Sequence, residues 1–79
     1  MAIKNYDAAR AMVTERFGES NLPAMEAFIR YIEAAKTFHE GASEENMALK
    51  IQAWTNVCDN FCAGDPDVMK FHVAIMHLI

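Results

Sequence analysis

Hydrophobic residues recur at helical spacing along this chain, most clearly between residues 66 and 78. One face of the helix predicted there carries Val68, Phe71, Ile75 and Leu78, and a second face carries Met69, Val73 and Met76. A helix with two apolar faces must be covered on two sides. A chain of 79 residues buries a small share of its surface and has little material for this purpose. The pattern therefore predicts a partner, most simply a second copy of the chain.

Three further segments show the same periodicity. No stretch alternates at a period of two for long enough to form a strand. We therefore predict an all-α fold, a small up-and-down bundle of about four helices that forms a single domain over residues 1–79. The predicted helices span residues 5–17, 22–39, 44–62 and 66–78.

Residues that commonly begin and end helices support these boundaries. Ser43 precedes the third predicted helix, and Asp65 followed by Pro66 precedes the fourth. Serine and aspartate are favoured N-caps, and proline suits the first helical position. Glycine is common immediately after a helix, and each of the first three predicted helices is followed by one: Gly18, Gly41 and Gly64.

The apolar stripes of the predicted helices indicate which side chains form the core. The 22–39 segment has two neighbouring apolar stripes and only a thin polar one, so we expect it to be the central helix. In the 44–62 segment the stripe at helical spacing comprises Met47, Ile51, Trp54, Cys58 and Phe61. Trp54 is therefore expected to be a core residue, because large aromatic side chains contribute strongly to core packing.

Composition and charge narrow the classes of function. The chain is 53% hydrophobic and carries a net charge of −4, which is typical of a globular protein and disfavours binding to nucleic acid or to anionic membranes. The segment at 66–78 is too short and too charged to span a bilayer. The N-terminal residues lack the apolar segment of a signal peptide. Together with two cysteines, expected as free thiols, this predicts a cytoplasmic protein.

A metal site is one alternative to consider. Cys58 and Cys62 lie four residues apart on one predicted helix face, and His72 is a conceivable third ligand. Zinc modules usually place cysteines on a turn, where backbone N–H groups are free to support the sulfurs. A helical pair lacks that support, and Cys58 falls on the apolar stripe, where free cysteine packs as a small hydrophobe. We therefore expect no metal and no cofactor.

No catalytic motif is present. The two serines, Ser20 and Ser43, both have a helix-capping explanation, and the isolated glycines form no phosphate-binding loop. The sequence thus predicts a non-enzymatic helical protein that acts by stoichiometric protein–protein binding, for instance a bacterial or phage adaptor or inhibitor directed at host machinery. The alternative is a small-ligand or metal-binding helical bundle that uses the space around Trp54, Cys58 and His72.

The fourth predicted helix is the expected site of self-association into a homodimer or other homo-oligomer. Its predicted interface residues are Met69, His72, Val73, Met76 and Ile79. Methionine suits an adaptable binding surface because its side chain is flexible and polarizable. His72 lies next to Phe71 and is expected at the edge of the core or in the interface. The simpler interpretation is an ordinary hydrogen-bonded histidine, and the alternative is a buried one that makes assembly sensitive to pH.

Overall fold

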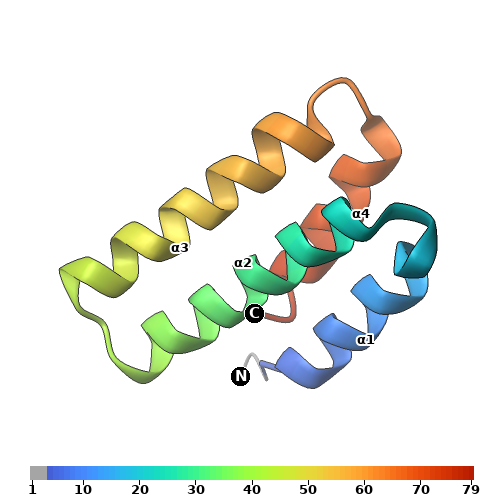
Figure 1. The fold of residues 1–79 in the computed structure, drawn as a ribbon. Coiled ribbons are helices and arrows are strands. Elements are labelled where there is room, and N and C mark those ends of the chain that lie inside the picture. The colour runs from blue at the N-terminus through green and yellow to red at the C-terminus, as the bar shows by residue number, and fades with distance from the viewer. Residues whose placement is uncertain (1–3) are drawn as a thin grey trace.

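A computed structural model describes residues 4–79, and within that range the chain forms four α-helices (Figure 1). The helices follow one another through short connections, as predicted, and the all-α class is confirmed. Their bounds lie within two residues of the predicted ones, apart from the end of the third helix. They are α1 (Tyr6–Arg16), α2 (Leu22–Glu40), α3 (Glu44–Val57) and α4 (Pro66–Met76).

Two short helical turns of other types were not predicted. A 3₁₀ turn, Gly18–Asn21, joins α1 to α2. The predicted single helix over 44–62 is α-helical only to Val57 and continues as a π-helical turn, Cys58–Cys62. In that turn the N–H of Ala63 donates to the carbonyl of Cys58 at 3.0 Å, a step of five residues. Such a turn leaves the hydrophobic period nearly unchanged over five residues, so the sequence pattern does not distinguish it from an α-helix.

Side-chain caps fix the start of every α-helix. In each case the side-chain oxygen of the N-cap residue accepts from the backbone N–H three residues later, which satisfies a donor that the helix itself leaves unpaired. The four caps are Asn5 to Ala8 (3.0 Å), Asn21 to Ala24 (3.3 Å), Ser43 to Asn46 (3.0 Å) and Asp65 to Val68 (3.2 Å). Each is worth about 1 kcal/mol of stability.

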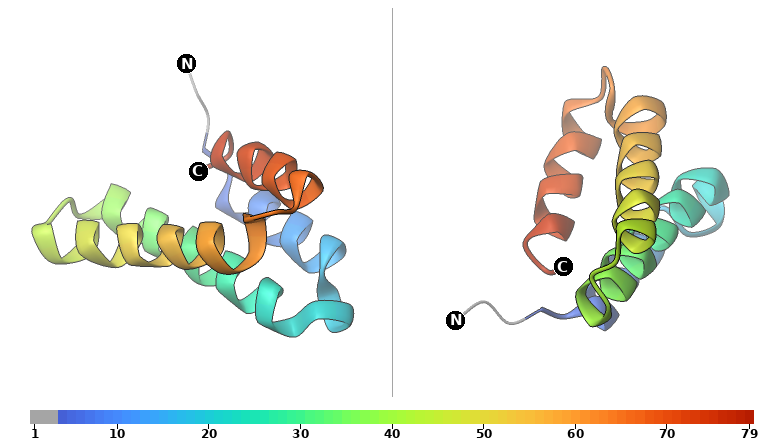
Figure 2. Two further views of the ribbon diagram at one scale, coloured as in Figure 1. Left: turned by 90° about the horizontal axis from the view of Figure 1, so that it is seen from above. Right: turned by 90° about the vertical axis from the view of Figure 1, so that its left-hand side faces the viewer.

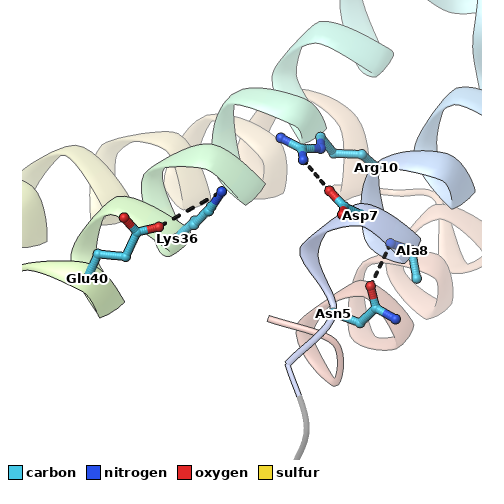
Figure 3. A network of polar contacts seen from close by, with 6 residues as sticks. All are labelled: Asn5, Asp7, Ala8, Arg10, Lys36 and Glu40. Atoms are coloured by element: carbon cyan, nitrogen blue, oxygen red, sulfur yellow. Dashed lines mark hydrogen bonds and ion pairs between the residues drawn. The ribbon is translucent and has the colours of Figure 1, made fainter.

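Figure 3 shows the first of these caps beside two surface ion pairs. Asp7 pairs with Arg10 within α1, and Lys36 approaches Glu40 within α2 at 3.9 Å. Both pairs are solvent-exposed, so each adds at most about 1 kcal/mol. The fold therefore depends on its caps and its core more than on these charges.

The core lies where α1, α2 and α4 meet. α2 packs against both α1 and α3, and six of its side chains are buried, which confirms it as the central helix: Ala24, Ala27, Phe28, Tyr31, Ile32 and Ala35. Across this junction the ring of Phe71 on α4 lies 5.4 Å from Phe28 and 5.5 Å from Phe17, measured between centroids. Edge-to-face contacts of this kind add stability beyond the area they bury.

The α2–α3 pair projects beyond this core, as Figure 1 and the left view of Figure 2 show. α4 folds back from the turn after the π-helical segment and ends near the start of α1. There the N–H of Asn5 donates to the carbonyl of Leu78 at 2.8 Å, and Lys4 Nζ donates to the carbonyl of Ile79 at the same distance. No helix within residues 4–79 is both long enough and apolar enough to cross a membrane.

The predicted orientation of α3 is wrong. Met47, Ile51 and Trp54 are exposed to solvent, and the side chains that α3 buries are Ala53 and Val57. Trp54 is therefore not a core residue. Asn46 and Lys50 are partly buried on the same side of α3 as Ala53 and Val57. Because these two residues are polar or charged, a prediction from hydrophobicity alone favours the opposite face.

Candidate interaction surface

Large apolar side chains are exposed to solvent on one face of α3 and on one face of α4, and the residues follow the same spacing on both helices. On α3 and on α4 the three residues stand four and then three positions apart, so each set follows one side of its helix. Six side chains make up what we call the α3–α4 apolar surface: Met47, Ile51, Trp54, Met69, Val73 and Met76. Each of them is between 42% and 54% exposed. Exposed apolar residues that gather in this way, unlike scattered ones, mark interaction sites.

A groove of about 260 Å³ includes the three α3 residues of this surface and Met76 of α4. α3 supplies one wall, Met76 of α4 contributes to the other, and α2 forms the floor. The groove residues are Tyr31, Phe38, Met47, Lys50, Ile51, Trp54 and Met76. Lys50 is the one charged residue among them. Its Nζ lies 5.0 Å from the centroid of the Phe38 ring, within the range of a cation–π contact.

The structure divides the five predicted interface residues into two groups. Met69, Val73 and Met76 are exposed on one side of α4, and we refer to them as the α4 stripe. His72 and Ile79 are buried, with 2% and 8% of their surface exposed. Within a single chain the α4 stripe is thus free for direct contact, whereas His72 and Ile79 pack inside.

His72 is enclosed by aromatic rings from α2. Its ring centroid lies 5.5 Å from that of Tyr31 and 5.9 Å from that of Phe28. Its Nε2 atom is buried without a hydrogen-bond partner among the described residues. Burial disfavours the charged imidazolium, so the pKa of His72 is lowered from its ordinary value. The groove residue Tyr31 therefore rests against a histidine that folding keeps neutral.

Replacing His72 with leucine is expected to reduce the pH dependence of stability. The imidazole titrates near pH 6.5 in the unfolded chain and at lower pH in the folded one. Between these two pKa values the unfolded chain binds more protons. The contribution of His72 to the free energy of unfolding is therefore fully present above about pH 6.5. It decreases as the pH is lowered further, by up to about 1.4 kcal/mol per pH unit. Urea unfolding at about pH 7.5 and about pH 5.5 should show a smaller loss for His72→Leu than for the parent.

The pH-dependent contribution of His39 to stability has to be separated from that of His72 in this experiment. Its pKa is also lowered, by partial burial and by the charges of Lys4 and Lys50, so it contributes in the same direction. His39→Asn should retain the His72 component of the pH dependence. An unchanged pH dependence in His72→Leu would contradict the assignment to His72.

The two cysteines form no recognisable metal site. Cys62 is buried and Cys58 half-buried, and both are free thiols. Burial and the nearby Cys58 and Asp65 raise the pKa of Cys62 to about 11, and burial and Asp59 raise the pKa of Cys58. High thiol pKa values oppose the thiolate form that binds metals. Over residues 4–79, no three His, Cys, Asp or Glu side chains are placed to share an ion, so the candidate set of Cys58, Cys62 and His72 is not assembled.

A second hollow, of about 440 Å³, lies on the other side of the α2–α3 pair. Five of its eight lining residues are polar or charged: Arg30, Glu33, Thr37, Gln52 and Asn56. No aromatic residue lines this hollow, whereas Tyr31, Phe38 and Trp54 line the groove. Ligand pockets are mostly apolar with a few convergent polar groups, so the groove is the better candidate site.

Sequence reasoning missed the α3 half of the surface. The sequence pattern assigns Met47, Ile51 and Trp54 to the core and indicates no role for Lys50. In the structure α3 buries Ala53 and Val57 and presents its larger side chains to solvent. Alanine allows close helix approach, and Ala34 of α2 lines the same hollow as Ala53.

No family model matches the chain, and neither the curated proteins nor the solved structures compared with it include a match. The function has to be argued from the residues themselves.

Proposed function

We propose that this chain is a non-enzymatic helical protein that acts by stoichiometric binding to another protein, as an adaptor or inhibitor, and that it self-associates. The observation that carries the proposal is the α3–α4 apolar surface. Six large apolar side chains on two neighbouring helices stay about half exposed in a chain with few residues to cover them. Interface cores are enriched in methionine and aromatic residues, and this surface holds three methionines and the only tryptophan of the chain.

Self-association is assigned to the α4 stripe. Met69, Val73 and Met76 lie on one side of α4, and a two-fold interface places the same patch of both copies in contact. The groove then remains available to a different protein, with Met76 at the border between the two regions. Free, poorly acidic thiols suit a reducing compartment, so we place this activity in the cytoplasm. A phage or bacterial protein acting on host machinery would fit this description.

Native mass spectrometry of the untagged protein tests the proposal. We expect a dimer or higher oligomer without additional mass. Emission from Trp54 should move to shorter wavelength when a protein partner covers the groove, because that side chain is 43% exposed in the single chain. A strictly monomeric protein that retains no partner from candidate host extracts would contradict the proposal. Additional bound mass would favour the alternative, a ligand-binding bundle.

A further inference from the structure

The residues that line the groove have the chemistry of a helix-binding site. One wall runs along α3 from Met47 to Trp54, a rise of about 10 Å, and the aromatic floor comes from Tyr31 and Phe38. Amphipathic helices bind such grooves through apolar anchors at positions i, i+3 or i+4, and i+7. A 10 Å wall accommodates anchors from about two turns. The methionine side chains at both edges can adapt to anchors of different shape.

Lys50 adds a charge requirement to this apolar site. The ion pairs between residues 4 and 79 are Asp7–Arg10 and Lys36–Glu40, so Lys50 has no acidic partner there. Lys50 and Lys4 both act on His39 and lower its pKa, so positive charge surrounds this end of α2. Glu40 acts on Tyr6, which contacts His39, but this carboxylate approaches Lys36. Lys50 is thus available to a carboxylate brought by the partner.

The net charge of the chain limits how acidic that partner can be. At −4 overall, the protein repels a strongly acidic helix at long range. The favourable contact is local, because Lys50 is half-buried beside an apolar groove where screening is weaker. A helix with one acidic residue at the edge of its apolar face, and an otherwise neutral or basic outer face, satisfies both conditions.

We propose that the groove between α3 and α4 binds one amphipathic α-helix of a partner protein, whose apolar face packs on Ile51 and Trp54 and whose single flanking carboxylate pairs with Lys50. This inference rests on the proposed function and specifies the partner. Apolar contact with the walls supplies most of the affinity. The carboxylate fixes the direction and register of the helix in the groove, since charge complementarity governs specificity more than affinity.

Two synthetic peptides test the inference. Both are helices of about 18 residues, long enough to be partly folded alone, with leucine anchors at i, i+3, i+4 and i+7. They differ at one flanking position, which is Glu in the first peptide and Lys in the second. Fluorescence anisotropy of labelled peptide measures binding, and Trp54 emission reports whether the groove is the site. We expect the Glu peptide to bind about fivefold more tightly.

Charge reversal supplies the decisive comparison. In Lys50→Glu the preference should invert in favour of the Lys peptide. Lys70→Glu makes the same charge change at an exposed position of α4 that does not line the groove, and it should keep the original preference. Ile51→Ser should weaken both peptides. Circular dichroism establishes that each variant is folded, which is expected because Lys50 and Ile51 are not core residues.

The outcomes separate this inference from the proposed function. If both peptides bind equally, or neither binds, while the chain still self-associates or retains another partner, the inference is wrong and the proposed function stands. If Trp54 emission changes with protein concentration alone and no peptide competes, a second copy occupies the groove and the inference is also wrong. If the protein is monomeric and binds nothing, both are wrong.

Discussion

Replacing Phe28 with alanine is expected to unfold much of the protein, whereas replacing Trp54 with alanine is expected to leave it folded. Phe28 is fully buried, and its ring packs at 5.3 Å from that of Phe17 and 5.4 Å from that of Phe71. Removing such a side chain costs about 3–5 kcal/mol. A domain of this size has about 4–12 kcal/mol of stability in total.

Trp54→Ala should cost about 1–2 kcal/mol, because the side chain is already 43% exposed and loses less buried area. Thermal melts followed by circular dichroism give the comparison. We expect a fall in Tm of about 15–30 °C for Phe28→Ala and a much smaller one for Trp54→Ala. The melts need protein dilute enough to be monomeric, since loss of an interface side chain also lowers Tm in an oligomer. Equal losses would mean that α3 buries Trp54 after all.

This contrast also marks how far the sequence predicts the fold. The helices were predictable because local chemistry fixes them: Ser43 and Asp65 cap the helices they precede, and Gly18 and Gly64 adopt positive φ angles of 47° and 78°. Glycine takes such angles at little cost. These signals act over a few residues, so they can be recognised without knowledge of the tertiary structure.

The rotation of α3 depends on its neighbour, and no local signal specifies it. Ala53 and Val57 are small enough to let α3 approach α2 closely, and this contact leaves the larger Met47, Ile51 and Trp54 outside. A rule that buries the most hydrophobic stripe therefore fails for α3. It succeeds for one face of α4, where Val68 and Ile75 are buried as expected.

The part of the candidate site that lies on one helix was predictable from the sequence, whereas the part built from several helices was not. The exposure of the α4 stripe was predictable because α4 carries two apolar faces and the core covers only one of them. The groove needs residues from three helices, and its floor of Tyr31 and Phe38 comes from stripes that the sequence assigns to the core. The role of Lys50 follows only from its position beside Phe38. Such a constellation depends on packing between elements, which the periodicity of single elements does not encode.

Val73→Glu is expected to dissociate the oligomer without unfolding the chain. Val73 is 46% exposed, lies in the α4 stripe and does not line the groove. In the single chain a glutamate there stays in water, and glutamate has a higher helix propensity than valine. At a two-fold interface the same change buries two carboxylates close together, at a cost of several kcal/mol. We expect the dissociation constant of the oligomer to rise at least about 100-fold.

Ala74→Glu is the matched control, because it adds the same charge at the next position of α4, which is exposed and outside the stripe. Light scattering after size-exclusion chromatography should show monomers for Val73→Glu and the parental oligomer for Ala74→Glu. Dissociation of both variants would indicate general charge repulsion and not a specific interface. If Val73→Glu remains oligomeric while Ile51→Glu does not, the copies meet through the groove. The α4 stripe would then be the part of the surface left for another protein, because the two regions share only Met76.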